Sequence, residues 1–128
     1  MRDELGLLTR SAEEELAADR DQQGAWLDEL RRVGLLSGDV EDAGVDQVVR
    51  ALYQYLGRTR SRLLALSLAD AVGDLRTQNQ PGTSDEYPNW RVPLTGPDGK
   101  KLLLEDVFTD PRAAALAEVM RVAVKTQG

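Results

Sequence analysis

The sequence predicts a mostly α-helical chain that forms one domain or part of one, with one short apolar segment and one short hairpin. Residues 45–56 and residues 111–124 repeat apolar side chains at the three- and four-residue spacing of an amphipathic helix. Between them, residues 77–91 form a polar stretch with two prolines and one glycine, which is typical of an irregular loop.

The first predicted helix covers residues 11–33. Ser11 and Glu14 have the spacing of a capping box, in which each side chain accepts a hydrogen bond from the backbone N–H of the other residue. Arg31 and Arg32 fall in the last turn, where positive charge interacts favourably with the helix dipole. The acidic residues at 13–15 are interpreted as a solvated first turn rather than as catalytic carboxylates.

The second predicted helix covers residues 45–56 and follows a polar linker in which Asp42 is a candidate cap. One face is apolar at every helical turn and consists of Val45, Val48, Val49, Leu52, Tyr53 and Leu56. We expect Tyr53 to lie in the core with its hydroxyl hydrogen-bonded, and Tyr55 to be half exposed.

The leucine-rich run at residues 63–68 is compatible with two structures. A strand that is apolar on both faces is typical of the centre of a parallel sheet, whereas the lack of β-branched residues favours a helix. The residues alone leave this choice open. Asp70 is a candidate cap for a short helical turn that ends at Gly73.

Two further elements are expected towards the C-terminus. A short hairpin is predicted at residues 91–103 around a turn at 96–99, with Pro93 indicating an edge position. Asp110 followed by Pro111 predicts the start of a final helix that runs over residues 111–124, with frayed residues at 126–128.

The composition excludes several kinds of chemistry. The chain of 128 residues has 16 basic and 22 acidic residues and neither cysteine nor histidine, so a disulfide, a cysteine-based zinc site and a Ser-His-Asp triad cannot form. The net charge of −6 argues against nucleic acid and anionic membranes as partners. No apolar run is long enough to span a membrane and no signal-peptide pattern is present, so a cytoplasmic protein without a metal or cofactor is expected.

The loop at residues 77–91 is the candidate binding surface. It combines Asn, Gln, Tyr and Trp, whose amides donate to and accept from hydroxyl groups and whose aromatic faces can cover the apolar side of a sugar ring. The alternative is a proline-stiffened connection in which Trp90 packs into the core. Composition alone favours this second interpretation.

The same loop resembles a known family. Residues 79–83 (Asn-Gln-Pro-Gly-Thr) and 85–91 (Asp-Glu-Tyr-Pro-Asn-Trp-Arg) resemble the C-terminal signature of the 4-alpha-glucanotransferases, or amylomaltases. Residues 62–74, the turn at 96–99 and residues 2–10 are similar to the bacterial enzymes as well. The resemblance covers essentially the whole chain, but only the C-terminal end of such an enzyme.

The resemblance implies a fold. Members of the family are built on a (β/α)8 barrel, and this chain would begin after the seventh strand, so that residues 63–68 would be the eighth. The chain would then be the C-terminal segment of a catalytic barrel. The loop at 77–91 would leave the C-terminal end of a barrel strand, which is where barrel active sites are assembled.

The resemblance also implies an activity, the transfer of α-1,4-glucan segments between maltodextrins by a retaining double displacement. Asn79 occupies the place of an asparagine that contacts glucose in the donor subsite. Gln80, Pro81 and Gly82 complete the predicted substrate-binding segment by shaping the loop around it. The catalytic carboxylates of the family lie upstream of this chain, so no catalytic residue is expected here and the isolated chain is predicted to be inactive.

The residues themselves agree that this chain lacks the catalytic pair. A retaining mechanism needs two carboxyl groups that face each other about 5 Å apart, and the adjacent Asp85 and Glu86 are expected to point away from each other. Trp90 is predicted to pack beneath the loop rather than to stack on a sugar. Asn89 and Asp70 are predicted to satisfy backbone groups.

Three functional classes follow. The favoured one is part of a 4-alpha-glucanotransferase, with maltodextrin as substrate and the upstream barrel segment of the same enzyme as its structural partner. The alternatives are a non-catalytic carbohydrate-binding module and a small helical interaction protein.

Overall fold

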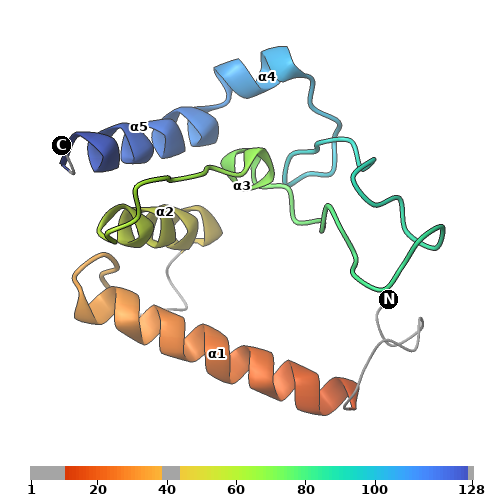
Figure 1. Ribbon diagram of the computed structural model, residues 1–128, viewed down its shortest axis with the longest axis horizontal. Coiled ribbons are helices and arrows are strands. Elements are labelled where there is room, and N and C mark those ends of the chain that lie inside the picture. Colours follow the sequence, from red (N-terminus) through yellow and green to blue (C-terminus); the bar gives the residue numbers. More distant parts are fainter. Residues whose placement is uncertain (1–10, 39–43, 127–128) are drawn as a thin grey trace. The chain divides into compact units, whose positions relative to one another are not determined.

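The structure is a computed structural model that describes residues 11–38 and 44–126. Two units divide the chain, one at Met1–Ser37 and one at Gly38–Gly128. The described residues contain helices and no strand. The helices are α1 (Ala12–Arg32), α2 (Val45–Gly57), α3 (Leu68–Val72), α4 (Leu104–Thr109) and α5 (Pro111–Thr126), as Figure 1 shows.

Helix α1 confirms the predicted capping box. The Ser11 hydroxyl accepts from the Glu14 backbone N–H at 3.2 Å, and the Glu14 carboxylate accepts from the Ser11 N–H at 3.0 Å. Two backbone donors at the helix start are therefore satisfied without tertiary contacts, which is why the start could be predicted from local sequence.

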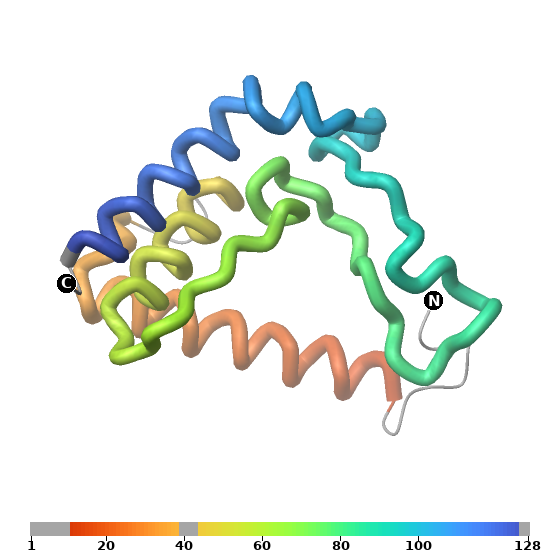
Figure 2. The backbone as a smooth tube through the Cα atoms, turned by 45° about the horizontal axis from the view of Figure 1, so that its top comes forward, coloured from red at the N-terminus to blue at the C-terminus, as the bar shows by residue number. Residues whose placement is uncertain are grey.

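Helices α2 and α5 form the body of the second unit and run side by side (Figure 2). Tyr53 of α2, Ala71 of α3 and Leu116 of α5 are buried together at their interface, with Val49, Leu66, Ala113, Val119 and Met120 packed around them. Gly57 permits the close approach at one end, because a Cβ atom there would lie 2.6 Å from the Ala123 Cβ. Burial of these apolar groups is the main stabilising contribution in this unit.

The two predicted helices of this unit are confirmed with small shifts. Helix α2 ends at Gly57, one residue beyond the prediction, and α5 ends at Thr126, two residues beyond it. The Asp110 carboxylate accepts from the Arg112 N–H at 2.7 Å, as expected of the residue that caps α5. The candidate cap Asp42 lies outside the described residues, and Gly44 is the N-cap of α2 without a side-chain hydrogen bond.

Helix α3 begins three residues earlier than predicted. Ser67, not Asp70, is its N-cap, and the Ser67 hydroxyl accepts from the Asp70 N–H at 3.4 Å. Asp70 was wrongly assigned because its carboxylate accepts from the Tyr53 hydroxyl of α2 at 2.7 Å instead. The predicted end is confirmed, since Gly73 closes the helix with a φ of 74° that favours glycine.

The strand predicted at residues 63–68 is not confirmed. Residues 63–67 connect α2 to α3 without helical structure, and Leu68 already belongs to α3. The backbone groups of residues 63–66 make no hydrogen bond to any other described residue. A strand is defined by such bonds to a neighbour, so an extended run without a neighbour is not one.

The hairpin predicted at residues 91–103 is reduced to a tight turn. One antiparallel bridge joins Thr95 to Lys101, and the Leu102 N–H donates to the Leu94 carbonyl at 3.0 Å. Pairing stops there because α4, which was not predicted, begins at Leu104, where the next pair of backbone bonds would form. The Asp106 carboxylate accepts from the Leu103 N–H at 2.7 Å and so fixes that helix start.

None of the described helices has the length and apolar character that crossing a bilayer would demand.

Candidate functional site

The candidate site is the loop at residues 77–91, which runs between α3 and the turn at 96–99 (Figure 2). It contains neither helix nor strand. Its shape therefore depends on side chains that bond to backbone groups, and three sets of such bonds hold it.

The first set lies at the base of the loop and centres on Asp74, whose side chain is fully buried. Its carboxylate accepts from the Arg76 guanidinium at 2.9 and 3.0 Å, from the Arg76 N–H at 3.0 Å and from the Thr95 N–H at 3.0 Å. The Arg76 guanidinium also donates to the Pro93 carbonyl. This cluster joins the two ends of the loop, because Asp74 precedes it and Thr95 follows it.

The same cluster explains the charge state of Asp74. The hydrogen bond from the Arg76 guanidinium lowers the pKa of the Asp74 carboxyl far below its ordinary value, and the backbone N–H groups of Arg76 and Thr95 lower it further. Burial acts in the opposite direction but is outweighed. Asp74 is therefore charged at neutral pH.

The second set lies inside the loop and centres on Asn89. Its side-chain oxygen accepts from the Gln80 N–H at 2.7 Å, and its amide nitrogen donates to the Thr83 carbonyl at 3.1 Å and the Thr83 hydroxyl at 2.9 Å. The Thr83 hydroxyl in turn donates to the Gln80 carbonyl at 2.7 Å. The prediction that Asn89 satisfies backbone groups is confirmed.

The third set joins the two arms of the loop near their ends. The Trp90 N–H donates to the Gln78 carbonyl at 2.9 Å, and the Tyr87 hydroxyl donates to the Thr77 carbonyl. Together with Asn89, these bonds close residues 78–90 into a ring-like loop whose backbone is fixed before any ligand arrives.

The four residues predicted to bind substrate lie on the first arm of this loop. The Gln80 side chain is buried, Pro81 and Gly82 are exposed, and Asn79 is partly exposed. Gly82 has a φ of 85°, which agrees with its predicted role in shaping the loop. The Asn79 backbone carbonyl accepts from the Thr77 hydroxyl at 2.8 Å, while its side-chain amide bonds to no described residue.

Sequence reasoning missed Gln78. Its side-chain nitrogen is buried and has no hydrogen-bond partner in the described part of the chain. Buried donors are almost always paired, so this amide, next to Asn79 in the chain, is a candidate functional group. The only signal in the sequence was its position next to the predicted contact residue.

The prediction for Trp90 was wrong. Its side chain is 78% exposed and does not pack beneath the loop. Its φ of 60° is unusual for a bulky residue, and the hydrogen bond from its own N–H to Gln78 helps to hold that conformation. The indole is therefore presented to solvent by a backbone that the loop constrains.

The two carboxylates of the loop lack the burial of a catalytic acid. Asp85 and Glu86 are both exposed, and the Ser84 N–H donates to the Glu86 carboxylate at 2.8 Å. That bond lowers the pKa of Glu86, whereas a general acid needs a raised pKa. Among the described residues, no group of three or more carboxylates is arranged to hold a metal ion.

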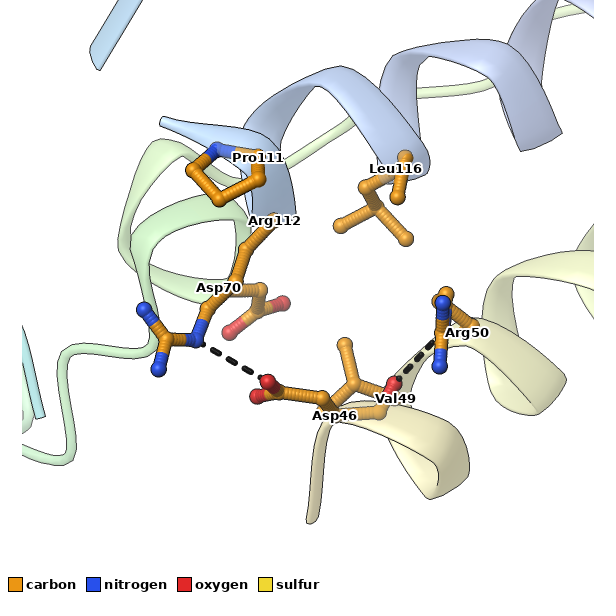
Figure 3. A pocket seen from close by; sticks show the side chains of 8 residues that line it. Asp46, Val49, Arg50, Asp70, Pro111, Arg112 and Leu116 are labelled. Atoms are coloured by element: carbon orange, nitrogen blue, oxygen red, sulfur yellow. Dashed lines mark hydrogen bonds and ion pairs between the residues drawn. The ribbon is translucent and has the colours of Figure 1, made fainter. Parts of the chain in front are cut away.

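A pocket of about 330 Å³ lies apart from the loop, in the second unit (Figure 3). It is bounded by the start of α2, by α3 and by the start of α5. Asp46, Arg50, Asp70 and Arg112 provide its charged lining, and Val49, Pro111, Ala115 and Leu116 provide its apolar lining.

Most of this chain matches a known protein family. The profile of the 4-alpha-glucanotransferase family matches residues 11–98, which include the whole candidate loop. The 4-alpha-glucanotransferases of Mycobacterium bovis and Mycobacterium tuberculosis are 64% identical over 123 residues, which are 96% of this chain and 17% of each relative. The Haemophilus influenzae 4-alpha-glucanotransferase is 36% identical over 52 residues, 41% of this chain and 7% of that protein.

A solved structure has the same fold over this region. The crystal structure of amylomaltase from Corynebacterium glutamicum superposes with a TM-score of 0.81 at 31% identity, covering 92% of this chain and 18% of that one. The chain thus spans about a sixth of the length of the curated mycobacterial relatives. Because the family profile matches most of its residues, the chain belongs to the 4-alpha-glucanotransferase family.

Proposed function

We propose that this chain is the C-terminal part of a 4-alpha-glucanotransferase and contributes a loop to the donor subsite of its active site. The activity is transfer of α-1,4-glucan segments between maltodextrins. Family membership and the similarity to whole 4-alpha-glucanotransferases support this assignment, and the matched region includes residues 77–91.

The segment at residues 63–67 supports a place in a (β/α)8 barrel. The backbone groups of residues 63–66 have no partner among the described residues, and Leu63 is 91% exposed while Leu66 packs on the helical core. An extended segment with one side on helices and free backbone groups is suited to pair with neighbouring strands. The loop then follows the C-terminal end of that strand, as in other barrel enzymes.

The observation that carries the proposal is that the Asn79 side-chain amide is available for hydrogen bonding. Asn89 and Thr83 use their polar groups to fix the loop, whereas the Asn79 amide bonds to no described residue. An amide carries both donors and an acceptor, which suits it to neighbouring sugar hydroxyls. The buried, unpaired Gln78 nitrogen provides a further donor in the same arm.

Trp90 supplies the apolar part of the site. An exposed indole on a constrained backbone can cover the C–H face of a glucose ring. The sugar-stacking role, which the sequence alone made the less favoured alternative, is the one that the exposed position supports.

The reaction itself depends on groups outside this chain. A retaining double displacement needs a carboxylate nucleophile and a carboxylic acid that face each other across the glycosidic bond. Asp85 and Glu86 are exposed and do not provide such a pair. The loop therefore binds and orients the donor sugar, and the isolated chain is inactive.

The test is kinetic and uses a complete enzyme that carries this chain. Asn79→Ala should lower kcat/KM for maltotriose disproportionation about ten-fold, because one or two hydrogen bonds of about 0.5–1.5 kcal/mol each are lost. Gln80→Ala should have a smaller effect, since that side chain is buried within the loop. The measurement is the initial rate of glucose release.

The matched control is Ser84→Ala, because Ser84 is exposed and its side chain makes no hydrogen bond to a described residue. Its kcat/KM should equal that of the unmodified enzyme. Equal, near-zero effects at Asn79 and Gln80 would show that the loop is structural and would refute the proposed donor contact.

A further inference from the structure

We propose that the pocket between α2, α3 and α5 is a second carbohydrate-binding site, which takes a single glucose unit of an α-glucan. The inference rests on the proposed function, because it takes the ligand class from the glucan substrate. None of the loop residues 77–91 lines this pocket, so it is a separate site.

The size and the apolar lining fit one sugar ring. A volume of about 330 Å³ is at the lower end of small-molecule sites, which start at roughly 300 Å³. Val49, Pro111 and Leu116 form an apolar wall on which the C–H groups of a pyranose can pack, and Leu116 is almost fully buried. The remaining lining is polar, as a hydroxyl-rich ligand requires.

The charges of the lining select a neutral ligand. Asp46 and Asp70 contribute two carboxylates, and Arg50 and Arg112 contribute two guanidinium groups, so the lining has no net charge. An anion would be attracted by the guanidinium groups but repelled by the carboxylates, and the reverse holds for a cation, so neither gains overall. A sugar has hydroxyl groups that donate to carboxylates and accept from guanidinium groups.

Each of the four charged side chains keeps part of its hydrogen-bonding capacity. Arg112 Nε donates to Asp46 Oδ2 at 2.9 Å, which leaves the second Asp46 oxygen without a described partner. Arg50 Nε donates to the Asp46 carbonyl at 3.2 Å, which leaves its two terminal nitrogens without one. Figure 3 shows these groups around the pocket, with the Arg50 side chain across from those of Asp70 and Arg112.

Asp70 is held by a buried partner outside the lining. The Tyr53 hydroxyl donates to Asp70 Oδ2 at 2.7 Å and accepts from the Ser67 N–H at 3.1 Å, and Tyr53 is buried in the core. The other Asp70 oxygen makes no hydrogen bond to a described residue. A carboxylate that is oriented before binding loses little freedom when a sugar hydroxyl arrives.

The experiment measures retention of a complete enzyme carrying this chain in native gels that contain amylopectin. Arg50→Ala removes the terminal guanidinium nitrogens and should raise the apparent dissociation constant for amylopectin about ten-fold. Ala115→Leu places a larger side chain of α5 in the pocket. It should raise the same dissociation constant by a similar factor, because it excludes the sugar sterically. Arg60→Ala is the control, because Arg60 is exposed and lies outside the pocket.

The outcomes separate the two proposals. Weaker retention of Arg50→Ala than of Arg60→Ala supports the second site, and Arg50→Ala alone decides if Ala115→Leu does not fold. Equal retention of these two arginine variants overturns the second site, as does an unmodified enzyme that amylopectin does not retain. Failure of the proposed function is seen separately, as an unmodified enzyme that does not disproportionate maltotriose.

Discussion

The helical core and the loop segment of the second unit are held together by different forces. In α2 and α5, Tyr53 and Leu116 are removed from water against a face of small and aliphatic side chains. In residues 74–103, Asp74 and Asn89 bond to the backbone of residues far along the chain. Burial is non-directional and tolerates small changes in shape, whereas a hydrogen bond fixes the position of each backbone group.

This contrast matters for the proposed function, in which the helices provide a stable support and the loop presents Asn79 and Trp90 in a defined geometry. Amide hydrogen exchange reports the free energy of opening for each region separately. It can therefore show whether a substitution in one region changes the stability of the other.

The largest effect is expected from the core. Leu116→Ala should lower the exchange protection of α2 and α5 by about 2–5 kcal/mol, because a buried leucine leaves a cavity when it is truncated. Val124→Ala, at an exposed position on the same helix, is the control and should change protection little. An equal loss of protection at Thr95 would show that the core and the loop open together, and would remove the distinction.

A smaller effect, confined to the loop base, is expected from Asp74. Asp74→Asn keeps the shape but removes the charge and one acceptor, at a cost of about 1.5–3 kcal/mol. The Thr95 and Arg76 amides, which donate to this carboxylate, should lose protection while α2 and α5 keep theirs. Unchanged exchange at Thr95 would contradict the assigned role of Asp74.

The two asparagines of the loop sharpen the comparison further. Asn89→Ala removes three hydrogen bonds inside the loop and should lower the protection of the Gln80 amide by about 1–2 kcal/mol. Asn79→Ala should leave that protection unchanged, because its side chain bonds to no described residue. Loss of protection in both variants would mean that Asn79 shapes the loop instead of binding sugar.

The smallest effect is expected from mild acid. The folded pKa of Asp74 is lowered, so its contribution to stability is present above the unfolded value of about 3.9 and is lost as pH falls through the folded value. The protection of Thr95, corrected for intrinsic exchange, should therefore stay constant from pH 7 to about pH 4.5. A decrease within that range would show that Asp74 titrates near its ordinary pKa.

Local sequence was sufficient for the three long helices α1, α2 and α5. The capping box of Ser11 and Glu14 and the apolar spacing in residues 45–56 and 111–124 involve residues within one or two turns of each other, so the chain encodes them without tertiary partners. The prediction that Asn89 satisfies backbone groups was also correct. In the candidate site, the motif at residues 79–82 includes Asn79, whose side-chain amide bonds to no described residue.

Tertiary structure decided the rest, because the deciding partners lie far along the chain. Tyr53 of α2 takes the Asp70 carboxylate and leaves Ser67 to cap α3. Asp74 accepts from the Thr95 N–H at the far end of the loop, and no local spacing predicts that bond. The exposure of Trp90 follows from the bonds that close the loop, and no spacing in the sequence reports those bonds. Residues 63–67 show the same dependence, since a strand needs the backbone groups of a neighbour as well as its own residues.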